Sequence, residues 1–516
     1  MAGKPETSPR LIAVGSGKGG AGKTLTVANV GIFLATLGKR VVVADVAFGS
    51  AALHTFVGLE RPRRTLRELW QRGGTNELSE LVTPTPIPGL SLVTGEVEPS
   101  APGGAPAEYM HRLLSALREL AADYVLLDLD TGPGTPILDL FLGADVSIVM
   151  MGPDPAAVEL GYGFLRAAFG RRLERAQLDR ELDLSQPELR HFAGGLATPR
   201  DIYDSARRTD EDLAARIESE MLALRPRIVI NNARSKADMD IGPAIATAGF
   251  RRLGLPLTHL GHIEYDDAAW VSLRRRRPLL VEHPESRAAK SIEKLTRRLV
   301  ARETEKQFVS VAVGGSYYEL FEVEPTASEE DIRRANRRAR SIYGKESVVV
   351  GGLYSTAQLE ELHARFDEAY ETLMDPARRK AYDQALFPGG VPPSAAARET
   401  LESRGALAVQ NEAPPPEERP PMPELSDDTE YSGALLQQVR ESRGIDLREI
   451  SERTKIGLPY LAAIESENVD KLPANVYVRG FLVQYTRILG LDRDRVLETY
   501  LPRLERARAE QEALEP

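Results

Sequence analysis

The feature that most constrains this chain is the stretch "GSGKGGAGKT" near its N-terminus. It follows the apolar run "LIAV", precedes the helical pattern "LTVANVGIFLATLG", and contains the motif G-x-x-x-x-G-K-[ST] from Gly17 to Thr24. In this strand–loop–helix setting, glycines let backbone N–H groups converge on phosphate oxygens, and the dipole of the following helix favours an anion. The motif predicts a site for ATP and Mg²⁺, in which Lys23 reaches the β- and γ-phosphates and Thr24 holds the metal. The rest of the cradle is Gly17, Lys18, Gly19, Gly20, Ala21 and Gly22.

Five short runs rich in valine and isoleucine predict buried strands between residues 10 and 300. They are "LIAVGSG", "RVVVADV", "YVLLDLD", "VSIVMMG" and "RIVINNA", and longer helical patterns separate them. Continuous apolar runs of this kind are typical of strands covered on both faces and joined by crossover helices. The sequence therefore predicts an α/β fold with a doubly wound, mostly parallel sheet, followed by two small all-α domains.

A second lysine, Lys18, gives the loop the form "KGGAGKT", which resembles the deviant Walker A loop of the MinD/ParA ATPases. The resemblance covers residues 10–300. The spacing and the stretch "LHTFVG" are most similar to the FlhG-like branch, which places flagella and other polar machines. In that family the signature lysine reaches across an ATP-sandwiched dimer to the partner's nucleotide. The resemblance thus implies a homodimer on ATP, with Lys18 in a catalytic role.

Further site residues follow from the same resemblance. Asp45, in "VVVADVAFGS", matches the first switch I aspartate, which supports the Mg²⁺ shell. In "DYVLLDLDTGPGT", similar to switch II, Asp128 matches the acidic residue near the metal and Gly132 the γ-phosphate-sensing glycine. The stretch "PRIVINNAR" resembles the adenine-recognition strand, with Asn231 as the base contact. The implied metal set is Thr24, Asp45 and Asp128.

Switch I departs from the family at one position that matters for hydrolysis. The family carries D-x-D, and its second aspartate helps position the attacking water. Here the residue at that second position is Ala47. The family's asparagine-like position a little further along the chain is also lost, because this chain has Ala52 there. Binding depends on the loop and the metal, whereas turnover depends on water orientation, and one positioning group is worth several orders of magnitude. We expect ATP binding with slow or absent hydrolysis. The alternative is a substitute carboxylate, Asp130 or Glu159.

Composition narrows the class of protein. The chain has 516 residues, no cysteine and a net charge of −10. The lack of cysteine excludes disulfides, thiol catalysis and Cys-ligated zinc, and fits a cytoplasmic protein. We see no signal peptide, and no apolar run reaches the roughly 20 residues that span a bilayer, so no transmembrane segment is expected. The basic run Arg274–Arg277 is either a nonspecific contact to DNA phosphates or a solvated helix end.

Residues 316–386 carry helical patterns only and look like a J-domain, with "DPARRKAYD" as the most specific part. Ser328 is expected to cap a helix from Glu329 to Tyr343, with Asp331 completing the cap. The residues expected to pack a second helix against it are Phe366, Ala369, Tyr370 and Leu373. The family's histidine–proline–aspartate trigger falls where this chain has Gly344, Lys345 and Glu346. We therefore expect a protein-docking hairpin without chaperone stimulation.

Residues 387–428 are rich in proline and glutamate and predict a disordered linker. Residues 431–508 resemble the helix-turn-helix module of RodZ, which docks on an actin-like filament. DNA binding would place Leu458–Glu467 in the major groove. That stretch has two glutamates and no Lys or Arg, and residues 431–500 carry 10 Lys/Arg and 10 Asp/Glu. A protein partner is therefore preferred to DNA.

Together these features predict an ATP-dimerised MinD/ParA-like switch or scaffold that recruits protein partners at a cell pole or on the cytoskeleton. The alternative function is a DNA-binding transcriptional regulator that ATP-dependent dimerisation controls.

Overall fold

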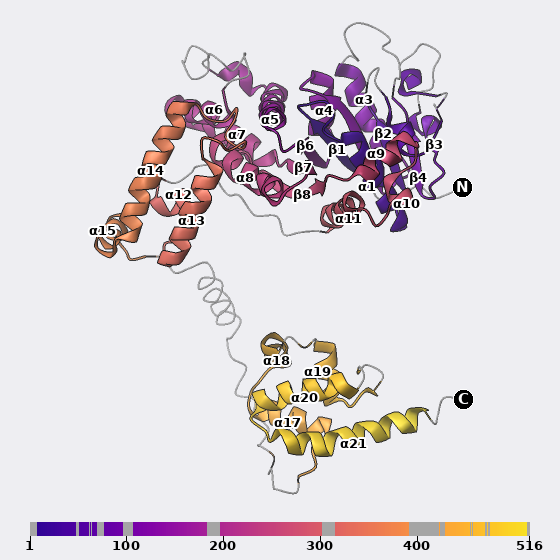
Figure 1. Cartoon of the computed structure of the whole chain (residues 1–516), viewed down its shortest axis with the longest axis vertical. Helices are drawn as coiled ribbons and strands as arrows, with labels where there is room; N and C mark the ends of the chain where they lie inside the picture. Colours follow the sequence, from indigo (N-terminus) through magenta and orange to yellow (C-terminus); the bar gives the residue numbers. More distant parts are fainter. Residues whose placement is uncertain are drawn as a thin grey trace. The chain divides into compact units, whose positions relative to one another are not determined.

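The computed structural model forms two compact units, residues 1–395 and 396–516, and each has a hydrophobic core of its own (Figure 1). It describes residues 8–47, 51–60, 62, 64–69, 77–95, 107–182, 197–301, 315–391, 423, 429–454, 456, 458–469, 472 and 475–512. None of the helices in these ranges is long and apolar enough to cross a membrane.

Within the described residues, the first unit is built on an eight-stranded sheet in the order β3-β4-β2-β5-β1-β6-β7-β8. Its strands are β1 (Arg10–Ser16), β2 (Val41–Asp45), β3 (Thr83–Pro84), β4 (Leu90–Val93), β5 (Tyr124–Thr131), β6 (Val146–Met151), β7 (Arg227–Ala233) and β8 (Thr258–Glu264). The β3–β4 pair is antiparallel and the other pairs are parallel. From β1 the chain crosses to β2 on one side of the sheet, whereas β6, β7 and β8 are added in turn on the other side of β1. Ligands of doubly wound sheets bind where the winding reverses, at the carboxyl ends of the strands.

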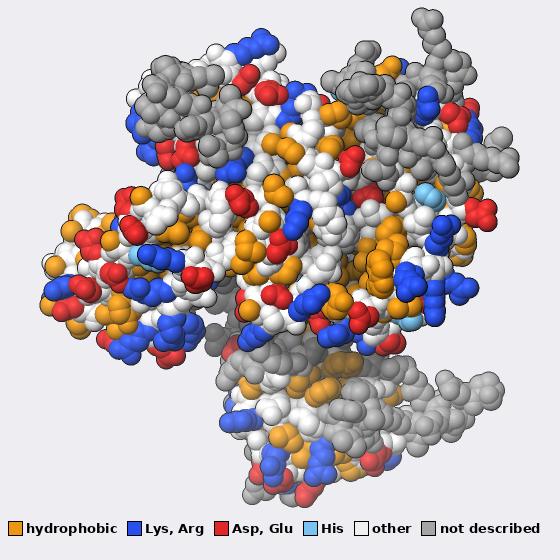
Figure 2. Space-filling view, turned by 45° about the horizontal axis from the view of Figure 1, so that its top comes forward, with side chains coloured by type: hydrophobic (Ala, Val, Ile, Leu, Met, Phe, Trp, Pro, Cys, Tyr) orange, Lys and Arg blue, Asp and Glu red, His pale blue; other side chains and the backbone are white. Residues whose placement is uncertain are grey.

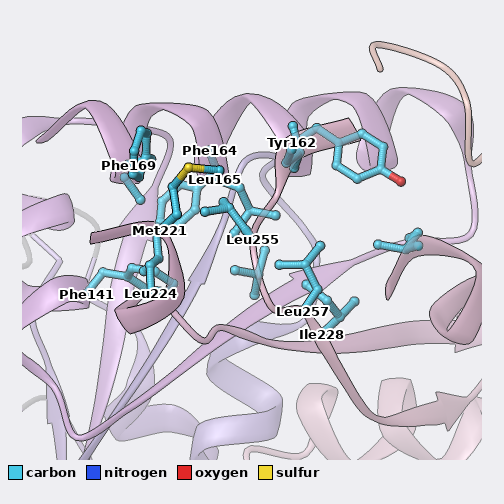
Figure 3. Packing of buried hydrophobic residues seen from close by; sticks show 14 of the residues in the cluster. Phe141, Tyr162, Phe164, Leu165, Phe169, Met221, Leu224, Ile228, Leu255 and Leu257 are labelled. Carbon is cyan, nitrogen blue, oxygen red and sulfur yellow. The ribbon is translucent and has the colours of Figure 1, made fainter. Parts of the chain in front are cut away.

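Helices cover both faces of the sheet, as the continuous apolar strands require. In β1, Ile12 and Val14 belong to the core cluster under α1 and α11, whereas Leu11 and Ala13 belong to the cluster on the opposite face. The first face carries α1 (Lys23–Thr36), α10 (Leu279–Glu282) and α11 (Arg287–Val300). The second face carries α3 (Ala107–Arg118), α4 (Thr135–Gly143), α5 (Pro155–Arg175), α6 (Pro199–Thr209), α7 (Glu211–Ala223) and α8 (Lys236–Leu253). Figure 3 shows large side chains of this second core, including Phe141 and Phe164, whose rings meet edge-on with centroids 5.0 Å apart.

The helices of residues 316–386 continue the core of the second face. They are α12 (Tyr317–Phe321), α13 (Glu329–Ile342), α14 (Thr356–Met374) and α15 (Pro376–Leu386). Figure 1 shows α13 and α14 beside α6 and α8, and one core cluster holds buried residues from all four helices. Ser328 and Asp331 form the expected capping box at the start of α13. Phe366, a residue expected in the second helix, is fully buried in α14.

The second unit is a small helical bundle. Its described helices are α17 (Gly433–Ser442), α18 (Leu447–Thr454), α19 (Leu458–Glu465), α20 (Asn475–Leu489) and α21 (Arg493–Glu512). Leucines, isoleucines and the rings of Tyr485 and Tyr500 fill its centre. The α18–turn–α19 pair is the helix-turn-helix that the sequence predicts.

The predicted α/β fold class is confirmed. The five predicted strands are β1, β2, β5, β6 and β7, whereas β3, β4 and β8 were not predicted. β3 has two residues and β4 four, while β8 lies at the sheet edge and mixes buried with partly exposed positions. Short or edge strands carry a weak apolar signal. The predicted linker, residues 387–428, lies mostly outside the described residues.

Candidate functional site

A loop from Gly17 to Gly22 joins β1 to α1 at the carboxyl edge of the sheet. Gly22 has φ of 87°, a left-handed conformation that suits glycine, and α1 begins at the next residue. A methyl group on Gly17 would come within 2.0 Å of the Leu160 carbonyl oxygen, because α5 passes directly behind the loop. Two glycines of the motif are thus required by the backbone itself, and the loop presents its N–H groups at the amino end of α1.

Lys23 is the first residue of α1 and is buried beneath the loop. Its Nζ donates hydrogen bonds to Ser16 Oγ and Thr131 Oγ1, each at 2.9 Å. Burial lowers the pKa of Lys23, and the nearby carboxylates of Asp128 and Asp130 oppose that shift. The amine therefore rests on two hydroxyls, which an incoming phosphate group could replace at small cost.

Asp45 and Asp128 are paired residues on the neighbouring strands β2 and β5, and both are buried. Asp45 accepts backbone hydrogen bonds from Ala47 at 3.2 Å, Ala52 at 2.8 Å and Leu53 at 2.9 Å. Burial nevertheless raises the pKa of Asp45. Burial and the charge of Asp45 raise the pKa of Asp128 to about 7, although a hydrogen bond from the Thr24 side chain lowers it.

The chemistry of this corner fits a divalent cation. Asp128 Oδ1 is buried and has no hydrogen-bond partner among the described residues. Two buried carboxylates side by side repel each other, and a bound cation would remove that repulsion. No described group of three or more His, Cys, Asp or Glu side chains could hold a metal alone. A magnesium ion here would use Thr24, one or two carboxylates, water and the nucleotide, as Mg²⁺ sites at phosphates commonly do.

The structure separates the two candidate substitutes for the missing switch I carboxylate. Asp130 lies near enough to act electrostatically on Lys23, Asp45 and Asp128. Its Oδ1 accepts the Thr131 N–H at 2.7 Å. Glu159, in contrast, lies against Gly352. Among the described residues it is not one of the groups that act electrostatically on Lys23, Asp45 or Asp128.

Lys18 is held within its own chain. Its Nζ contacts Asp154 Oδ1 at 2.8 Å, and the Lys18 side chain is 42% exposed. Asp154 also caps α5 by accepting the Ala157 N–H at 3.0 Å. The lysine side chain lowers the pKa of Asp154. This is an exposed pair, so its exchange for another anion would cost little.

Of the other predicted residues, Asn231 and Gly132 lie beside the phosphate loop, whereas the basic run lies apart from it. Asn231, at the end of β7, is buried and donates from Nδ2 to the Ala21 carbonyl at 3.0 Å. The Gly132 N–H donates to the Ser16 carbonyl at 3.0 Å. The run Arg274–Arg277 is exposed between α9 (Asp267–Arg274) and α10, close in sequence to Trp270, which is 63% exposed.

Sequence reasoning missed three residues of this site. Ser16 and Thr131 hold the Lys23 amine, and Asp154 holds Lys18. An aspartate followed by proline is a helix-start signal, so "PDPAA" could have indicated Asp154 as an N-cap. No local pattern indicates the hydroxyls, because their role depends on which strands are neighbours.

The turn at the J-domain trigger position leads into a segment that faces the α/β part of the first unit. Gly344, Lys345 and Glu346 follow α13, and the next residues pack on α5 and α8. Tyr162 Oη donates to the Val349 carbonyl at 3.0 Å, and Arg252 Nε donates to the Leu353 carbonyl at 3.1 Å.

The helix-turn-helix modifies the charge argument made from sequence. Glu465 of α19 is buried, pairs with Arg440 at 2.6 Å and accepts a hydrogen bond from Tyr485. Glu467 accepts the Gly433 N–H at 2.7 Å. Both glutamates therefore make contacts within the fold, and the charge of Glu465 is paired with that of Arg440. The exposed side chains of α19 include Leu458 and Tyr460, 40% and 41% exposed, which are apolar or aromatic.

Comparison with known proteins places this site in a family. The profile of the CobQ/CobB/MinD/ParA nucleotide binding domain matches residues 12–378. The chain belongs to this family. A helix-turn-helix domain profile matches residues 435–496. The family match spans the phosphate loop, both buried aspartates and the whole of the pair α13 and α14, which is called the hairpin from here on.

Individual relatives are site-determining proteins. The MinD protein of Synechocystis is 35% identical over 150 residues, covering 29% of this chain and 55% of that protein. The flagellum site-determining protein YlxH of Helicobacter pylori is 28% identical over 159 residues, covering 30% and 53%. The chain thus spans about half the length of these curated relatives.

Among solved structures, MinD of Pyrococcus horikoshii complexed with Mg-ADP is 17% identical, with 57% of this chain and 96% of that chain covered and a TM-score of 0.36. The ATP complex of a Cyanothece McdA variant is also 17% identical, with 59% and 99% covered and a TM-score of 0.36.

Proposed function

We propose that this protein binds ATP with Mg²⁺ at the phosphate loop, dimerises on the nucleotide and serves as a site-determining scaffold with weak or absent hydrolysis. The observation that carries the proposal is the assembly of Lys23, Thr24, Asp45 and Asp128 around one loop, with Ala47 beside them. The bound cation would offset the charge of the phosphates and of the two aspartates. The family match and the site-determining relatives support the same function.

Slow hydrolysis follows from what Asp45 and Ala47 can do. Three backbone donors of the described part of switch I bond to Asp45, which holds this carboxylate beside the proposed metal position. Ala47 has no side-chain acceptor with which to orient a water molecule. Asp130 is the nearby carboxylate that remains, but its Oδ1 is already engaged by the Thr131 N–H. Binding groups are thus present and the usual water-positioning group is absent.

Protein recruitment is assigned to the helical additions. The RodZ-like unit exposes Leu458 and Tyr460 on α19, and Tyr460 packs against the Phe481 ring at 5.7 Å. An exposed aromatic and aliphatic face without a basic side chain suits a protein partner better than a phosphate backbone. The J-like hairpin is proposed as a fixed docking element without chaperone stimulation, since Gly344, Lys345 and Glu346 replace the trigger. An actin-like filament is the proposed partner class for the helix-turn-helix.

The test is single-turnover hydrolysis with excess full-length protein, wild type beside Ala47→Asp. We expect the aspartate variant to hydrolyse ATP at least tenfold faster, because it restores a carboxylate that positions water. Ala121→Asp is the matched control, because Ala121 is exposed and precedes β5 at the sheet edge opposite the phosphate loop. Intact ATP in the purified wild-type protein would agree with slow turnover. Equal rates for wild type and Ala47→Asp would refute the impaired hydrolysis.

The second candidate function, a transcriptional regulator, rests on the helix-turn-helix profile match. It predicts a salt-dependent, sequence-specific shift of duplex DNA by the ATP-loaded full chain. Tyr460→Ala would then weaken DNA binding by the exposed face of α19. No shift at low salt would exclude this function and leave the protein-scaffold proposal standing.

A further inference from the structure

A second pocket lies at the junction between the hairpin and the α/β part of the first unit, away from the phosphate loop. It has a volume of about 360 Å³ and is lined by side chains of α6, α8 and α14 together with Tyr354. This volume falls within the range of small-molecule sites, roughly 300–1,000 Å³. Figure 1 shows the elements that contribute to it lying side by side.

Arginines dominate the lining of this pocket. Arg200, Arg251, Arg252 and Arg365 line it, with Glu361 as the acidic member. Arg252 is paired with Asp201 at 2.7 Å, and Asp204 acts electrostatically on Arg200. The four arginines of the lining outnumber Glu361, and they still outnumber the carboxylates by one when Asp201 and Asp204 are counted with it. A partly enclosed site with such an excess attracts anions.

Nη1 of Arg251 is buried in this lining and has no hydrogen-bond partner among the described residues. The hydroxyls of Tyr354 and Tyr343 interact with each other through a side-chain hydrogen bond. The contacts of Arg251 are the Glu319 and Leu320 carbonyls, on its Nη2, and the rings of Tyr343 and Phe366, beneath its guanidinium carbon. Leaving a buried donor without a partner is unfavourable, so a ligand that offers a hydrogen-bond acceptor would fit this position better than an apolar ligand.

The pocket is also partly apolar. Leu320, Leu362 and the Tyr354 ring line it beside the arginines. A free inorganic anion would leave these groups in contact with water. A ligand with a phosphate at one end and a planar or apolar group at the other would satisfy both parts of the lining.

We propose that this pocket is a second ligand site, distinct from the phosphate loop, that takes a small phosphate monoester of about mononucleotide size. Its phosphate contacts the arginines and its organic half packs on Tyr354 and the leucines. Because the lining comes from both the hairpin and α6 and α8, an occupied pocket fastens the hairpin to the α/β part. The proposal goes beyond the proposed function and does not depend on hydrolysis at the phosphate loop.

The experiment uses calorimetric titration of the full-length protein with its phosphate loop filled by magnesium and excess non-hydrolysable ATP analogue. The probes are AMP, adenosine and inorganic phosphate. We expect AMP to bind at least tenfold more tightly than either half alone, and Arg200→Ala to weaken AMP binding at least tenfold. Arg207→Ala, an exposed arginine on the same helix α6 outside the pocket, is the matched control. Arg365→Glu, at an exposed position, is the second variant should Arg200→Ala not fold.

Three outcomes would overturn the proposal. AMP binding that Arg200→Ala and Arg365→Glu leave unchanged would place the ligand elsewhere. If AMP binding disappears in the Lys23→Ala variant, the AMP site is the phosphate loop. The proposal expects this variant to keep its AMP binding. If inorganic phosphate binds as tightly as AMP, the organic half of the ligand contributes nothing to binding, contrary to the proposal. Failure of the ATP analogue to bind would count against the proposed function alone, because the pocket variants still report on AMP.

Discussion

At the scale of single residues, the phosphate site is defined by Asp45 and Asp128, two buried carboxylates at paired positions of neighbouring strands. Asp45 is held by three backbone donors, while Asp128 has a buried oxygen without a partner among the described residues. The pKa of Asp128 is raised to about 7 by burial and by Asp45. The pair is therefore arranged for a cation. Without a cation, the burial and mutual repulsion of the two carboxylates lower the stability of the folded protein.

This arrangement predicts opposite effects of Asp128→Asn with and without ligand. Without magnesium the variant should be more stable by about 1 kcal/mol, because a repelled buried charge is removed. With magnesium and ATP analogue it should gain less stabilisation than wild type, because a metal-supporting carboxylate is lost. Thermal unfolding with and without ligand measures both effects. Asp130→Asn is the control, and equal behaviour of the two variants would contradict the assigned roles.

His259 on β8 predicts a separate pH dependence of stability. Burial, then His262, lowers the pKa of His259 to about 4. As the pH falls, His259 takes up a proton in the unfolded chain before it does so in the folded protein. The contribution of neutral His259 to the free energy of unfolding is therefore complete above about pH 6.5 and is lost as the pH falls toward 4. The loss amounts to at most about 3 kcal/mol, at 1.36 kcal/mol per pKa unit.

His259→Gln should flatten the fall of the unfolding free energy between pH 6.5 and 4 in chemical denaturation. The control is His111→Gln, at an exposed position on α3. A variant that keeps the wild-type slope would show that other groups carry the pH dependence.

The role of a residue could be predicted from sequence where a local motif indicated it. It could not be predicted where the role depends on a contact that only the fold creates. The motif alone indicated Lys23 and Thr24, and the family resemblance added Asp45, Asp128 and Asn231, all of which the structure places around the loop. The contact of Lys18 with Asp154 joins residues 136 positions apart. No local pattern encodes a pairing of that range.

At the scale of elements, the caps and core strands followed from sequence and the partners of the helices did not. Ser328 with Asp331 reads as a capping pattern and forms one. The apolar stripe of the hairpin helices was also visible, but a stripe does not say what covers it. In the structure one core cluster holds Phe366 together with Tyr162 of α5. The same limitation explains Glu465, which was counted from sequence as evidence against DNA binding although its side chain is buried in the fold.

The Arg440–Glu465 pair predicts the stability of the second unit. Arg440→Met leaves the Glu465 carboxylate buried, with Tyr485 still beside it, and should destabilise the unit by about 3–5 kcal/mol. Replacing both residues by methionine should recover most of that loss, because no buried charge then remains.

Hydrogen exchange of peptides from residues 433–500, measured in the full chain, reports the change. Arg487→Met, at an exposed position of α20, serves as control. A double variant as unstable as Arg440→Met would show that the pair itself, and not the unpaired charge, sets the stability.

At the scale of the whole molecule, the chain joins two separately packed units. On the face drawn in Figure 2, the described acidic and basic side chains are interspersed. This agrees with a protein that uses local surfaces for its contacts. The family profile ends at residue 378, near the start of α15, and the compact first unit extends to residue 395.

The docked hairpin has a practical consequence for anyone who cuts this protein into pieces. A fragment ending at Val300 would strip the cover from Tyr162, whose hydroxyl bonds the Val349 carbonyl, and from the arginines of α8. We expect such a fragment to aggregate or to melt at least roughly 5 °C below one ending at residue 391, since buried apolar surface becomes wet. Light scattering and thermal melting of the two fragments decide this. Equal solubility and melting would mean that the hairpin is a removable accessory; otherwise the smallest self-sufficient nucleotide-binding piece includes it.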